Sequence, residues 1–395
     1  MKTETTGETV AVILAAGKNK RMLSSLPKSM HRVGGTPMIG MVYESVRRSG
    51  IKRCIVVVAD GSDEIRQYLG GKAEYACQKE QLGTGHALQT ALDYLDAAAA
   101  RRHNEAPTAS GRRLEAAAQK IEDTETFPAR PETAVAEDCP VGAFYGRLLV
   151  AYGDMPFVSA DTFKSLTQGS AKAGEAGALV YADLPEPNKY GYGRIIRDAG
   201  GNFVKIVEQR DATEEEAQIR ESNVGVYCFD AAAVREALVK VRPDNAQGEI
   251  YLTDVFAPML EAGGRVGLHK ATDNIECAGA NDRAALAELN RIARIKKCRE
   301  LMLDSGVTLV DPESAYIDGS VSVGADTVVY PGCVIEGATI IGSGCEIGPN
   351  ATIRDSRVGD GAKIINSVVS GATIGDGAVV GPYAHVTGGF TNATA

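Results

Sequence analysis

A small basic loop near the start of the chain carries the residues best suited to chemistry. Residues 10–14 are apolar and predict a buried strand, which ends in the small residues Ala15-Ala16-Gly17. Cations follow at Lys18, Lys20 and Arg21, and Pro27-Lys28 comes one short segment later. Because backbone amides can approach a polyphosphate and cations neutralise its charge, this pattern predicts a polyphosphate site. The alternative is an ordinary strand-turn-helix joint with solvated lysines.

Two further segments offer groups for a base and for a metal ion. Residues 78–86 read QKEQLGTGH, with amides, a hydroxyl and two glycines that can read the edge of a base through hydrogen bonds. The alternative there is a turn that caps a helix at Thr84. Asp154 follows a predicted strand at residues 148–152, which is a common place for a ligand of a divalent metal ion. Its alternative is the N-cap of a helix.

Polar groups among apolar strands predict a sugar pocket farther along the chain. They lie in YGYGR at residues 190–194, at Glu208 in IVEQRDA and at Asn223 in ESNVG. Taken singly, these segments are turns and caps. The segment GANDR at residues 279–283 offers a second oxygen ligand for the metal ion, or a cap for the helix that follows.

The composition argues against several classes of protein. The 395 residues carry a net charge of −9, which argues against a nucleic-acid polymer as partner. No apolar run approaches the ~18 residues of a membrane span. Residues 1–9 are polar and acidic, unlike a signal peptide, so we expect a cytoplasmic protein. The eight cysteines contain no C-x-x-C pair, which predicts buried free thiols rather than a zinc site or disulfides.

Alternating strands and helices must position these groups. Strands are predicted at residues 10–14, 54–59, 148–152, 178–181 and 225–229, with helices between them that include residues 37–49 and 161–171. This order predicts an α/β fold with a mostly parallel sheet, whose ligands bind beyond the carboxyl ends of the strands. Residues 97–145 break the pattern, and we interpret them as a surface insertion, partly helical near residues 112–122 and otherwise mobile.

The last part of the chain has a hexapeptide period. β-branched residues recur every six positions from Ile317 to Ile353, slip by one at Val358, and resume through Ile364, Val368, Ile374, Val380 and Val386. Such a period predicts a parallel β-helix in which each coil buries one Ile or Val per face. Prisms of this kind generally associate three-fold, so we expect a homotrimer. An amphipathic stretch before them, at residues 282–304, predicts a connecting helix.

Nine ordered motifs resemble those of a known family. LAAGKNKRM, LPKSMH, QKEQLGTGHA, YGDMP, YGYGRI, IVEQRDA, ESNVGVY, NAQGEIYLTD and GANDR are similar to bacterial N-acetylglucosamine-1-phosphate uridylyltransferase, the pyrophosphorylase half of a bifunctional enzyme. The resemblance implies a Rossmann-like nucleotidyltransferase domain at residues 1–281, a linker helix at 282–304 and a truncated left-handed β-helix at 305–395. It implies Mg²⁺-dependent transfer of UMP from UTP to N-acetylglucosamine 1-phosphate, a step in the synthesis of cell-wall precursors.

The resemblance also assigns roles residue by residue. Arg21 and Lys28 are the catalytic cations, and Asp154 and Asn281 hold Mg²⁺. The sugar contacts are Gly193, Glu208 and Asn223. Gln78, Gly83 and Thr84 would read the uracil, and the full set of nucleotide contacts is Leu14, Ala15, Ala16, Gly17, Lys28, Gln78, Gly83, Thr84, Tyr152 and Gly153.

This chain departs from the family pattern in two places. The family usually has glycine-threonine where this chain has Asn19-Lys20, so Lys20 either adds a phosphate cation or crowds the loop. In the family the β-helix continues and carries the acetyl-transfer histidine and the coenzyme A contacts. Here we expect about four coils that stop at residues 387–390, and His385 lies in the wrong motif for that histidine. The sequence therefore predicts that acetyltransferase activity is absent.

Two alternatives stay open from the sequence. The chain could act on glucose 1-phosphate or on a different nucleotide, as another sugar-1-phosphate nucleotidyltransferase. It could also be a non-catalytic regulatory or scaffold homologue. The intact set of Lys28, Asp154 and Asn281 argues against the second alternative, because drift would erode metal ligands as well.

Overall fold

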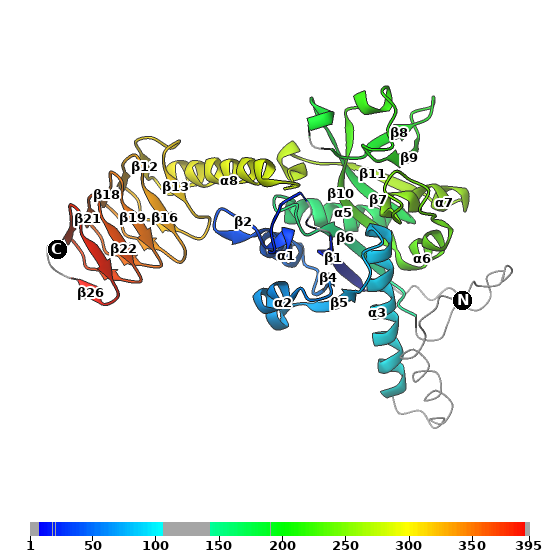
Figure 1. The fold of residues 1–395 in the computed structure, drawn as a ribbon, viewed down its shortest axis with the longest axis horizontal. Helices are drawn as coiled ribbons and strands as arrows, with labels where there is room; N and C mark the ends of the chain where they lie inside the picture. Colours follow the sequence, from blue (N-terminus) through cyan, green and yellow to red (C-terminus); the bar gives the residue numbers. More distant parts are fainter. Residues whose placement is uncertain (1–7, 18, 20, 106–142, 190, 392–395) are drawn as a thin grey trace.

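A computed structural model describes residues 8–17, 19, 21–105, 143–189 and 191–391. An α/β body comes first, helix α8 (Arg283–Leu303) leads away from it, and a prism of short strands follows (Figure 1). The middle of the predicted insertion, residues 106–142, lies outside the described residues. Its first residues, 97–105, continue helix α3 (Thr84–Glu105). Within the described ranges, no helix has both the length and the apolar character to cross a membrane.

The α/β body is built on one nine-stranded sheet. Its main path has the order β11-β7-β10-β6-β1-β4-β5, and β8 and β9 extend it beside β10. Every strand on this path runs in the same direction except β10, which is antiparallel to β6 and β7. The expected parallel sheet is therefore mixed. The strands are β1 (Thr9–Leu14), β4 (Arg53–Ala59), β5 (Glu74–Gln78), β6 (Arg147–Tyr152), β7 (Gly177–Asp183), β8 (Arg194–Arg197), β9 (Phe203–Val207), β10 (Glu221–Asp230) and β11 (Val266–Lys270).

Strand β1 lies in the interior of the sheet, between β6 and β4, and its side chains alternate between the two faces. Val10, Val12 and Leu14 belong to one buried cluster, while Ala11 and Ile13 belong to the cluster on the opposite face. Successive side chains of a strand point to opposite faces, so an unbroken apolar run is needed where both faces are covered. Leu14 pairs with Tyr152 of β6, which places the loops after β1 and β6 side by side.

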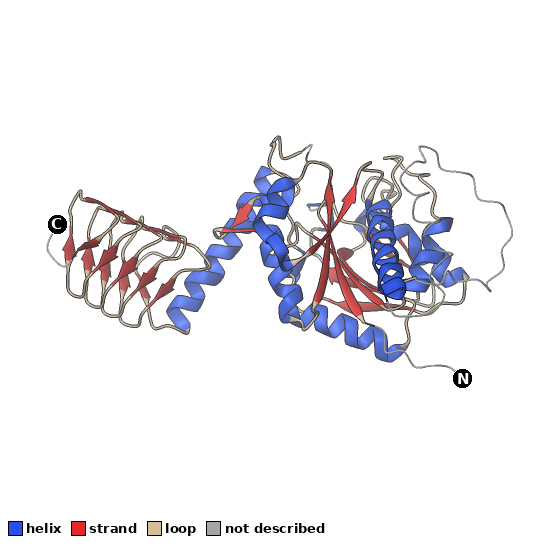
Figure 2. Cartoon of the chain, turned by 90° about the horizontal axis from the view of Figure 1, so that it is seen from below, coloured by secondary structure: helices blue, strands red, loops and turns tan. Residues whose placement is uncertain are grey.

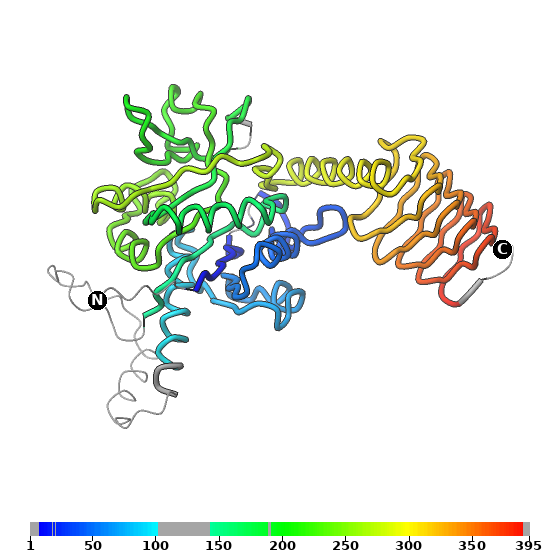
Figure 3. The backbone as a smooth tube through the Cα atoms, turned by 180° about the vertical axis from the view of Figure 1, so that it is seen from behind, coloured from blue at the N-terminus to red at the C-terminus, as the bar shows by residue number. Residues whose placement is uncertain are grey.

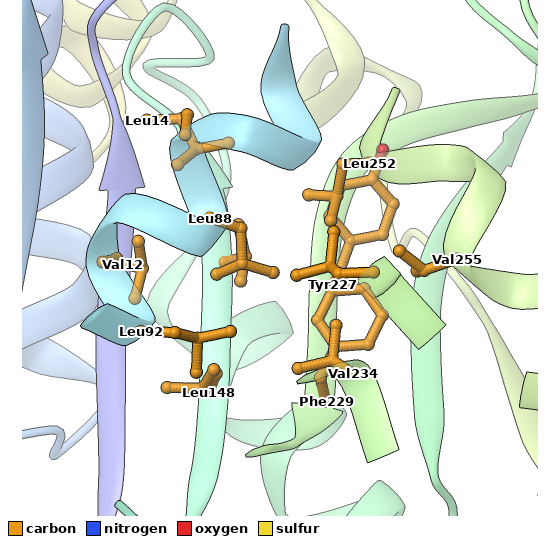
Figure 4. Close-up of a cluster of buried hydrophobic side chains, with 14 of the residues drawn as sticks. Val12, Leu14, Leu88, Leu92, Leu148, Tyr227, Phe229, Val234, Leu252 and Val255 are labelled. Carbon is orange, nitrogen blue, oxygen red and sulfur yellow. The ribbon is translucent and has the colours of Figure 1, made fainter. Parts of the chain in front are cut away.

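Helices cover both faces of this sheet (Figure 2). On one face, Leu88 and Leu92 of α3 pack near Val12 and Leu148, and helices α6 and α7 complete the cover (Figure 4). On the other face, α1, α2 and α5 supply apolar side chains that include Ile39, Ile65 and Phe163. Truncating a core residue such as Leu88 to alanine would cost ~2–5 kcal/mol of stability. The remaining helices are α1 (Met38–Arg48), α2 (Asp63–Leu69), α5 (Ala160–Ala173), α6 (Ala231–Lys240) and α7 (Phe256–Glu261), with short 3-10 turns η1 (Lys28–Met30), η2 (Gly70–Lys72), η3 (Pro187–Lys189), η4 (Glu216–Gln218), η5 (Leu252–Val255) and η6 (Asn274–Cys277).

The prism is a left-handed parallel β-helix with three five-stranded sheets. The sheet orders are β12-β15-β18-β21-β24, β13-β16-β19-β22-β25 and β14-β17-β20-β23-β26. Each coil contributes one strand to each sheet. The strands are β12 (Thr308–Leu309), β13 (Tyr316–Ile317), β14 (Ser322–Val323), β15 (Val328–Val329), β16 (Val334–Glu336), β17 (Ile340–Ile341), β18 (Glu346–Ile347), β19 (Thr352–Arg354), β20 (Arg357–Val358), β21 (Lys363–Ile364), β22 (Val368–Ser370), β23 (Thr373–Ile374), β24 (Val379–Val380), β25 (His385–Thr387) and β26 (Phe390–Thr391).

Two details of the predicted repeat were wrong. Val368 is 40% exposed, and Val369 is the fully buried residue that pairs with Ile353. The reason is a shortened coil: Ile335 pairs with Ile353 eighteen residues on, but Ile353 pairs with Val369 only sixteen residues on. The repeat also does not stop at residues 387–390, because Phe390–Thr391 forms the last strand of a fifth coil.

A small hairpin of β2 (Arg32–Val33) and β3 (Thr36–Pro37) joins the α/β body to α8 and the β-helix (Figure 3). The Gly34 amide donates to Asn290 Oδ1 on α8 (3.0 Å), and the Gly34 carbonyl accepts from the amide of Gly319 (3.1 Å). Gly35 has φ +81°, and a Cβ there would lie 2.3 Å from the carboxyl of Asp318. Glycine is therefore required at this contact.

The described cysteines are free thiols, as expected. All are buried except Cys77, which is partly exposed. Cys139 lies outside the described residues.

Candidate active site

A cavity of about 430 Å³ opens at the carboxyl ends of β1 and β6. Twelve of the residues that the sequence assigned to ligands line it: Leu14, Ala15, Ala16, Gly17, Arg21, Lys28, Gln78, Gly83, Thr84, Tyr152, Asp154 and Asn281. Four others do not line it: Gly153, Gly193, Glu208 and Asn223. Six other residues also line it: Ser29, Gln81, Ala87, Arg210, Gln247 and Glu249. Of these, only Gln81 belongs to the segment predicted to read a base, and none was assigned a role singly.

The floor of the cavity is made by the loops that leave the two central strands. The Ala15 amide donates to the carbonyl of Val57 (2.9 Å), and the Gly153 amide donates to the carbonyl of Leu14 (3.0 Å). A Cβ on Gly153 would lie 3.0 Å from a methyl of Ile39. Gly153 therefore lies below the cavity floor, where it allows the loops after β1 and β6 to pack closely together. A Cβ on Gly17 would meet no protein atom within 4 Å, so this glycine leaves room on the ligand side.

Four polar side chains from distant parts of the chain converge at one end of the cavity, here called the phosphate end: Arg21, Lys28, Asp154 and Asn281. The Lys28 ammonium forms an ion pair with Asp154 and donates to Asn281 Oδ1 (2.8 Å). Arg21 donates to the same Asn281 oxygen (3.1 Å). The side chains of Lys28 and Asp154 are 21% and 20% exposed, so both can reach a ligand from solvent. Two cationic side chains and two side chains with oxygen atoms that could bind a metal ion are thus held within one hydrogen-bonded group.

The oxygen atoms of this group suit a divalent metal ion. A carboxylate oxygen of Asp154 and the amide oxygen of Asn281 already contact one positive charge, the Lys28 ammonium. Hard oxygen donors of this kind suit Mg²⁺, which is commonly held by one or two side chains together with substrate phosphates. The described residues contain no cluster of three or more His, Cys, Asp or Glu that could hold a metal ion by itself.

The departure from the family at Asn19 has a structural role. The Asn19 amide nitrogen donates to the carbonyls of Ser24 (3.0 Å) and Leu26. Its side chain therefore bridges the loop between Arg21 and Lys28, and it is not among the residues that line the cavity. Lys18 and Lys20 lie outside the described residues.

The segment predicted to read the base is fixed by backbone bonds to a second loop. The Gly85 amide donates to the Ile250 carbonyl (2.8 Å), and the Ile250 amide donates to the Leu82 carbonyl (2.8 Å). A Cβ on Gly83 would lie 2.5 Å from the Ile250 oxygen, so this close approach requires glycine. Thr84 Oγ1 accepts from the Leu252 amide (2.9 Å).

Gln78 lies buried beside this segment. Its side-chain nitrogen lies 3.2 Å from the Gly83 carbonyl and 2.9 Å from His86 Nδ1. These contacts engage the nitrogen within the protein.

The three predicted sugar contacts lie together and are here called the sugar end. Gly193 directly precedes β8, Glu208 directly follows β9, and Asn223 lies near the start of β10. The Asn223 amide donates to the Gly193 carbonyl (2.9 Å), and a Cβ on Gly193 would lie 3.4 Å from Glu208 Oε1. Asn223 Nδ2 donates to the hydroxyl of Tyr227 (2.7 Å), which lies 3.4 Å from the hydroxyl of Tyr152. These partners form a largely buried polar network near the start of β10.

Glu208 has an unusual environment for a carboxylate. It accepts a hydrogen bond from Thr253 Oγ1 (2.9 Å). Burial raises the pKa of Glu208, and the nearby carboxylates of Asp254 and Asp211 add to this effect while the Thr253 bond opposes it. Burial and Asp211 also raise the pKa of Asp254, to about 6. A buried carboxylate with a raised pKa is a common feature of functional sites.

Tyr192 connects the sugar end with the phosphate end. Its hydroxyl donates to the Cys277 carbonyl and accepts from the Gly279 amide (3.1 Å). The Ala280 amide in turn reaches the Asp154 carbonyl at 3.4 Å. The loop that carries Asn281 is therefore fastened to the loop that carries Gly193.

Two of the unassigned lining residues, Gln247 and Glu249, come from the segment NAQGE. Asn245 organises this turn, because its Oδ1 accepts from the amides of Gln247 and Glu249, both at 3.2 Å. Arg210 donates to Gln247 Oε1 (2.9 Å). The motif was part of the family resemblance, but it offered no signal for which of its side chains would face the cavity.

Comparisons with known proteins agree with this geometry. Residues 11–199 match the MobA-like NTP transferase domain, and residues 320–355 match the bacterial transferase hexapeptide repeat. In fold, the chain is similar to a putative glucose-1-phosphate thymidylyltransferase from Bacillus anthracis, solved with sucrose (TM-score 0.50, 16% identity, 72% of this chain and 95% of that one). At that identity, the likeness shows the fold alone.

The chain is also similar to curated proteins along nearly its whole length. It is 38% identical to the bifunctional protein GlmU of Caldanaerobacter subterraneus subsp. tengcongensis, over 96% of this chain and 72% of that protein. It is 40% identical to the bifunctional protein GlmU of Geobacillus sp. strain WCH70, over 95% of this chain and 71% of that protein. A nucleotidyltransferase domain followed by hexapeptide coils is common to the motifs, the fold and the two family models that match. The chain therefore belongs to the GlmU family and is a nucleotidyltransferase.

Proposed function

We propose that the chain transfers UMP from UTP to N-acetylglucosamine 1-phosphate, giving UDP-N-acetylglucosamine and pyrophosphate. The proposal rests mainly on one observation. Four polar side chains converge at the carboxyl ends of β1 and β6: Arg21, Lys28, Asp154 and Asn281. The sugar end supports the choice of acceptor, because Glu208 and Asn223 offer a carboxylate and an amide for hydroxyl and acetamido groups.

The reaction joins two anions, so it needs alignment and charge neutralisation more than bond-making by the protein. An oxygen of the sugar 1-phosphate attacks the α-phosphorus of UTP in line; the new P–O bond forms as the bond to pyrophosphate breaks. The attacking phosphate is already ionised, so no protein nucleophile is required. Lys28 and Arg21 neutralise the phosphate oxygens and hold the two reactants in line.

We propose that Asp154 and Asn281 hold Mg²⁺ with the substrate phosphates. When bound, the ion supplies Lewis-acid neutralisation of phosphate oxygens. Lys28 then has two sets of partners, since its ammonium contacts Asp154 and Asn281 in the structure and phosphate oxygens in the complex.

Pyrophosphate release across a grid of nucleoside triphosphates and sugar 1-phosphates tests the proposal. We expect turnover to be highest with UTP and N-acetylglucosamine 1-phosphate and to require a divalent metal ion. Higher turnover with glucose 1-phosphate or with another base would assign a different nucleotidyltransferase. No release with any pair would instead favour the non-catalytic alternative.

We also propose that the β-helix assembles three copies of the chain. The support is a prism of three parallel sheets that presents flat faces with exposed apolar side chains, including Tyr316, Ile340 and Val368. Light scattering should then return three times the 41.5 kDa mass of one chain. A monomer mass at micromolar concentration would contradict this proposal.

Acetyl transfer by these 395 residues stays predicted absent. His385 is exposed on β25, and its motif is not the one that carries the acetyl-transfer histidine in the family pattern. The prediction is tested by coenzyme A release from acetyl-coenzyme A with glucosamine 1-phosphate, against a blank for the eight native thiols. Release above that blank that depends on glucosamine 1-phosphate would overturn it.

A further inference from the structure

The first turns of α8 lie against the segment that carries the catalytic cations. Leu289 of α8 packs in one buried cluster with Val33, Met38 and Ala280, and Leu286 packs against that cluster. Asn290 donates to the Arg32 carbonyl (3.2 Å) and accepts from the Gly34 amide (3.0 Å). The helix therefore supports residues 22–38 from one side over more than two turns.

Arg283, the first residue of α8, contacts this segment at two places, one on each side of Lys28. Its Nε donates to the Met22 carbonyl (3.1 Å), and its NH1 lies 3.3 Å from His31 Nδ1. Met22 follows Arg21 directly, and His31 comes three residues after Lys28. One planar guanidinium thus spans the stretch of chain that presents both cations, while it touches neither of them in the structure.

The contact with His31 fixes the state of the imidazole. A guanidinium can donate but cannot accept, so Nδ1 is the acceptor and the ring proton lies on Nε2. His31 is 6% exposed, and both burial and the charge of Arg283 lower its pKa. Nε2 has no hydrogen-bond partner among the described residues. Arg283 is therefore the partner that orients this ring in the described structure.

The residue two positions before Arg283 is the predicted metal ligand Asn281. Asp282 caps α8 by accepting from the Ala285 amide (2.8 Å), which fixes the start of the helix. Asn281 Oδ1 accepts from Lys28, 253 residues away in sequence, and from Arg21, 260 residues away. The start of α8 therefore positions Asn281 directly. Through Arg283 it also positions the segment that carries Arg21 and Lys28.

We propose that Arg283 is a positioning residue for the transfer. It holds Arg21 and Lys28 in a fixed position relative to Asn281, so that the phosphate groups and the metal ion are bound in one geometry. The proposal rests on the proposed function. A bidentate, planar group is suited to this task because it fixes both distance and angle, whereas a lysine supplies a single flexible charge. A displacement of about 1 Å at a reacting group can cost roughly a hundredfold in rate.

The experiment compares Arg283→Ala and Arg283→Lys with a matched control, Arg294→Ala. Arg294 lies on the same helix, donates to the Glu313 carbonyl and lies over the ring of Tyr316, away from the cavity. For Arg283→Ala we expect a fall in kcat/KM of roughly 10–100-fold and a similar rise in the Mg²⁺ concentration for half-maximal activity. Arg283→Lys should recover part of the loss. Arg294→Ala should leave the kinetic constants unchanged.

A double-mutant cycle separates positioning from a general effect on the fold. If Arg283 acts through the cations, the loss from Arg283→Ala should shrink to roughly threefold or less in a Lys28→Ala background. An undiminished loss in that background would overturn the proposal. So would kinetic constants that are normal per folded molecule, with only a lowered thermal midpoint, since that result would show a brace for the fold and nothing more.

Binding measurements keep this test separate from the proposed function. UTP affinity in the presence of Mg²⁺, measured by calorimetry, should weaken in Arg283→Ala whether or not the acceptor sugar is correctly assigned. Unchanged affinity and metal dependence would contradict the role of Arg283. Failure of the unmodified chain to turn over any sugar phosphate would contradict the proposed function instead.

Discussion

The phosphate end of the cavity and the sugar end, whose three predicted contacts do not line the cavity, are built in opposite ways. At the phosphate end, partly exposed charges from three remote segments meet through long side chains, as in the contact of Lys28 with Asp154 and Asn281. At the sugar end, Asn223 and Tyr227 lie four residues apart on one strand, β10, and are buried. The charged side chains of the phosphate end can neutralise phosphate groups that still contact water. The buried groups of the sugar end can instead discriminate between sugars by shape and hydrogen bonding, because water does not compete there.

This contrast predicts different kinetic effects at the two ends. Substitutions at the phosphate end should lower kcat, because the charge that they remove acts on the transition state. Substitutions at the sugar end should raise KM for the sugar phosphate, because they remove contacts made equally before and during reaction.

Asp154→Ala should have the largest effect. It removes a charged oxygen donor and the ion-pair partner of Lys28, so turnover should fall by roughly two orders of magnitude or more. Thermal unfolding should change little, because the side chain is partly exposed. Asp183→Ala is the matched control, since that aspartate ends β7 and pairs with Arg220 (2.8 Å) outside the cavity. Near-normal turnover of Asp154→Ala at saturating Mg²⁺ would refute the metal assignment.

Glu208→Gln should raise KM for the sugar phosphate by roughly 10–100-fold and leave KM for UTP nearly unchanged, since a hydrogen bond to a charged group contributes ~1.5–3 kcal/mol. Glutamine keeps the acceptor for Thr253 but not the charge. In the unmodified enzyme the pKa of Glu208 is raised, so the affinity for the sugar should fall as the pH drops through that raised pKa. The variant should lose this pH dependence.

The same substitution should change stability in a direction set by linkage. Because the folded pKa of Glu208 lies above its unfolded value, the ionised form is disfavoured in the fold. That penalty is fully present above the folded pKa and disappears as pH falls through it. Glu208→Gln should therefore raise the thermal midpoint at alkaline pH. Asp254→Asn is the necessary control, since Asp254 has its pKa raised to about 6 and titrates in the same direction.

Tyr192→Phe should affect the phosphate end and the sugar end together. The variant removes the hydroxyl that accepts from Gly279 and donates to Cys277, so the loop that carries Asn281 loses its link to the sugar end. We expect a several-fold rise both in KM for the sugar phosphate and in the Mg²⁺ requirement, roughly 1–3 kcal/mol in total. Tyr75→Phe, which removes a hydroxyl bonded to the Gly70 carbonyl (2.7 Å), is the control. A change in only one of the two constants would show that Tyr192 does not couple the ends.

Asn19→Gly should have the smallest effect, and its sign is informative. The Asn19 amide bridges the carbonyls of Ser24 and Leu26, so glycine should loosen the loop and weaken UTP binding a few-fold, roughly 0.5–1.5 kcal/mol. Lys20→Thr, measured separately, reports the charge of Lys20. Tighter UTP binding by Asn19→Gly would show that the asparagine crowds the nucleotide instead.

The sequence predicts those parts that depend on local patterns. The apolar run of β1 could be recognised because a strand covered on both faces needs continuous burial, and Asp154 could be placed because it follows such a strand. The phase of the β-helix could not be followed through the shortened coils, since Val368 and Val369 are equally β-branched and the repeat itself changes length. Arg210 and Gln81 reach the cavity from polar loops, whose side-chain directions carry no periodic signal.

The long sequence distance between Lys28 and Asn281 has a consequence for how the protein is made. At roughly 5–20 residues per second, the ribosome adds Asn281 about 13–50 s after Lys28. During that interval the basic loop has been made, but its later partner on the same side of the cavity has not. The coils of the β-helix face no such delay, because each strand pairs with one made 16–20 residues earlier. The phosphate end is therefore among the last parts of the α/β body to assemble during synthesis, whereas the stem can grow coil by coil as it emerges.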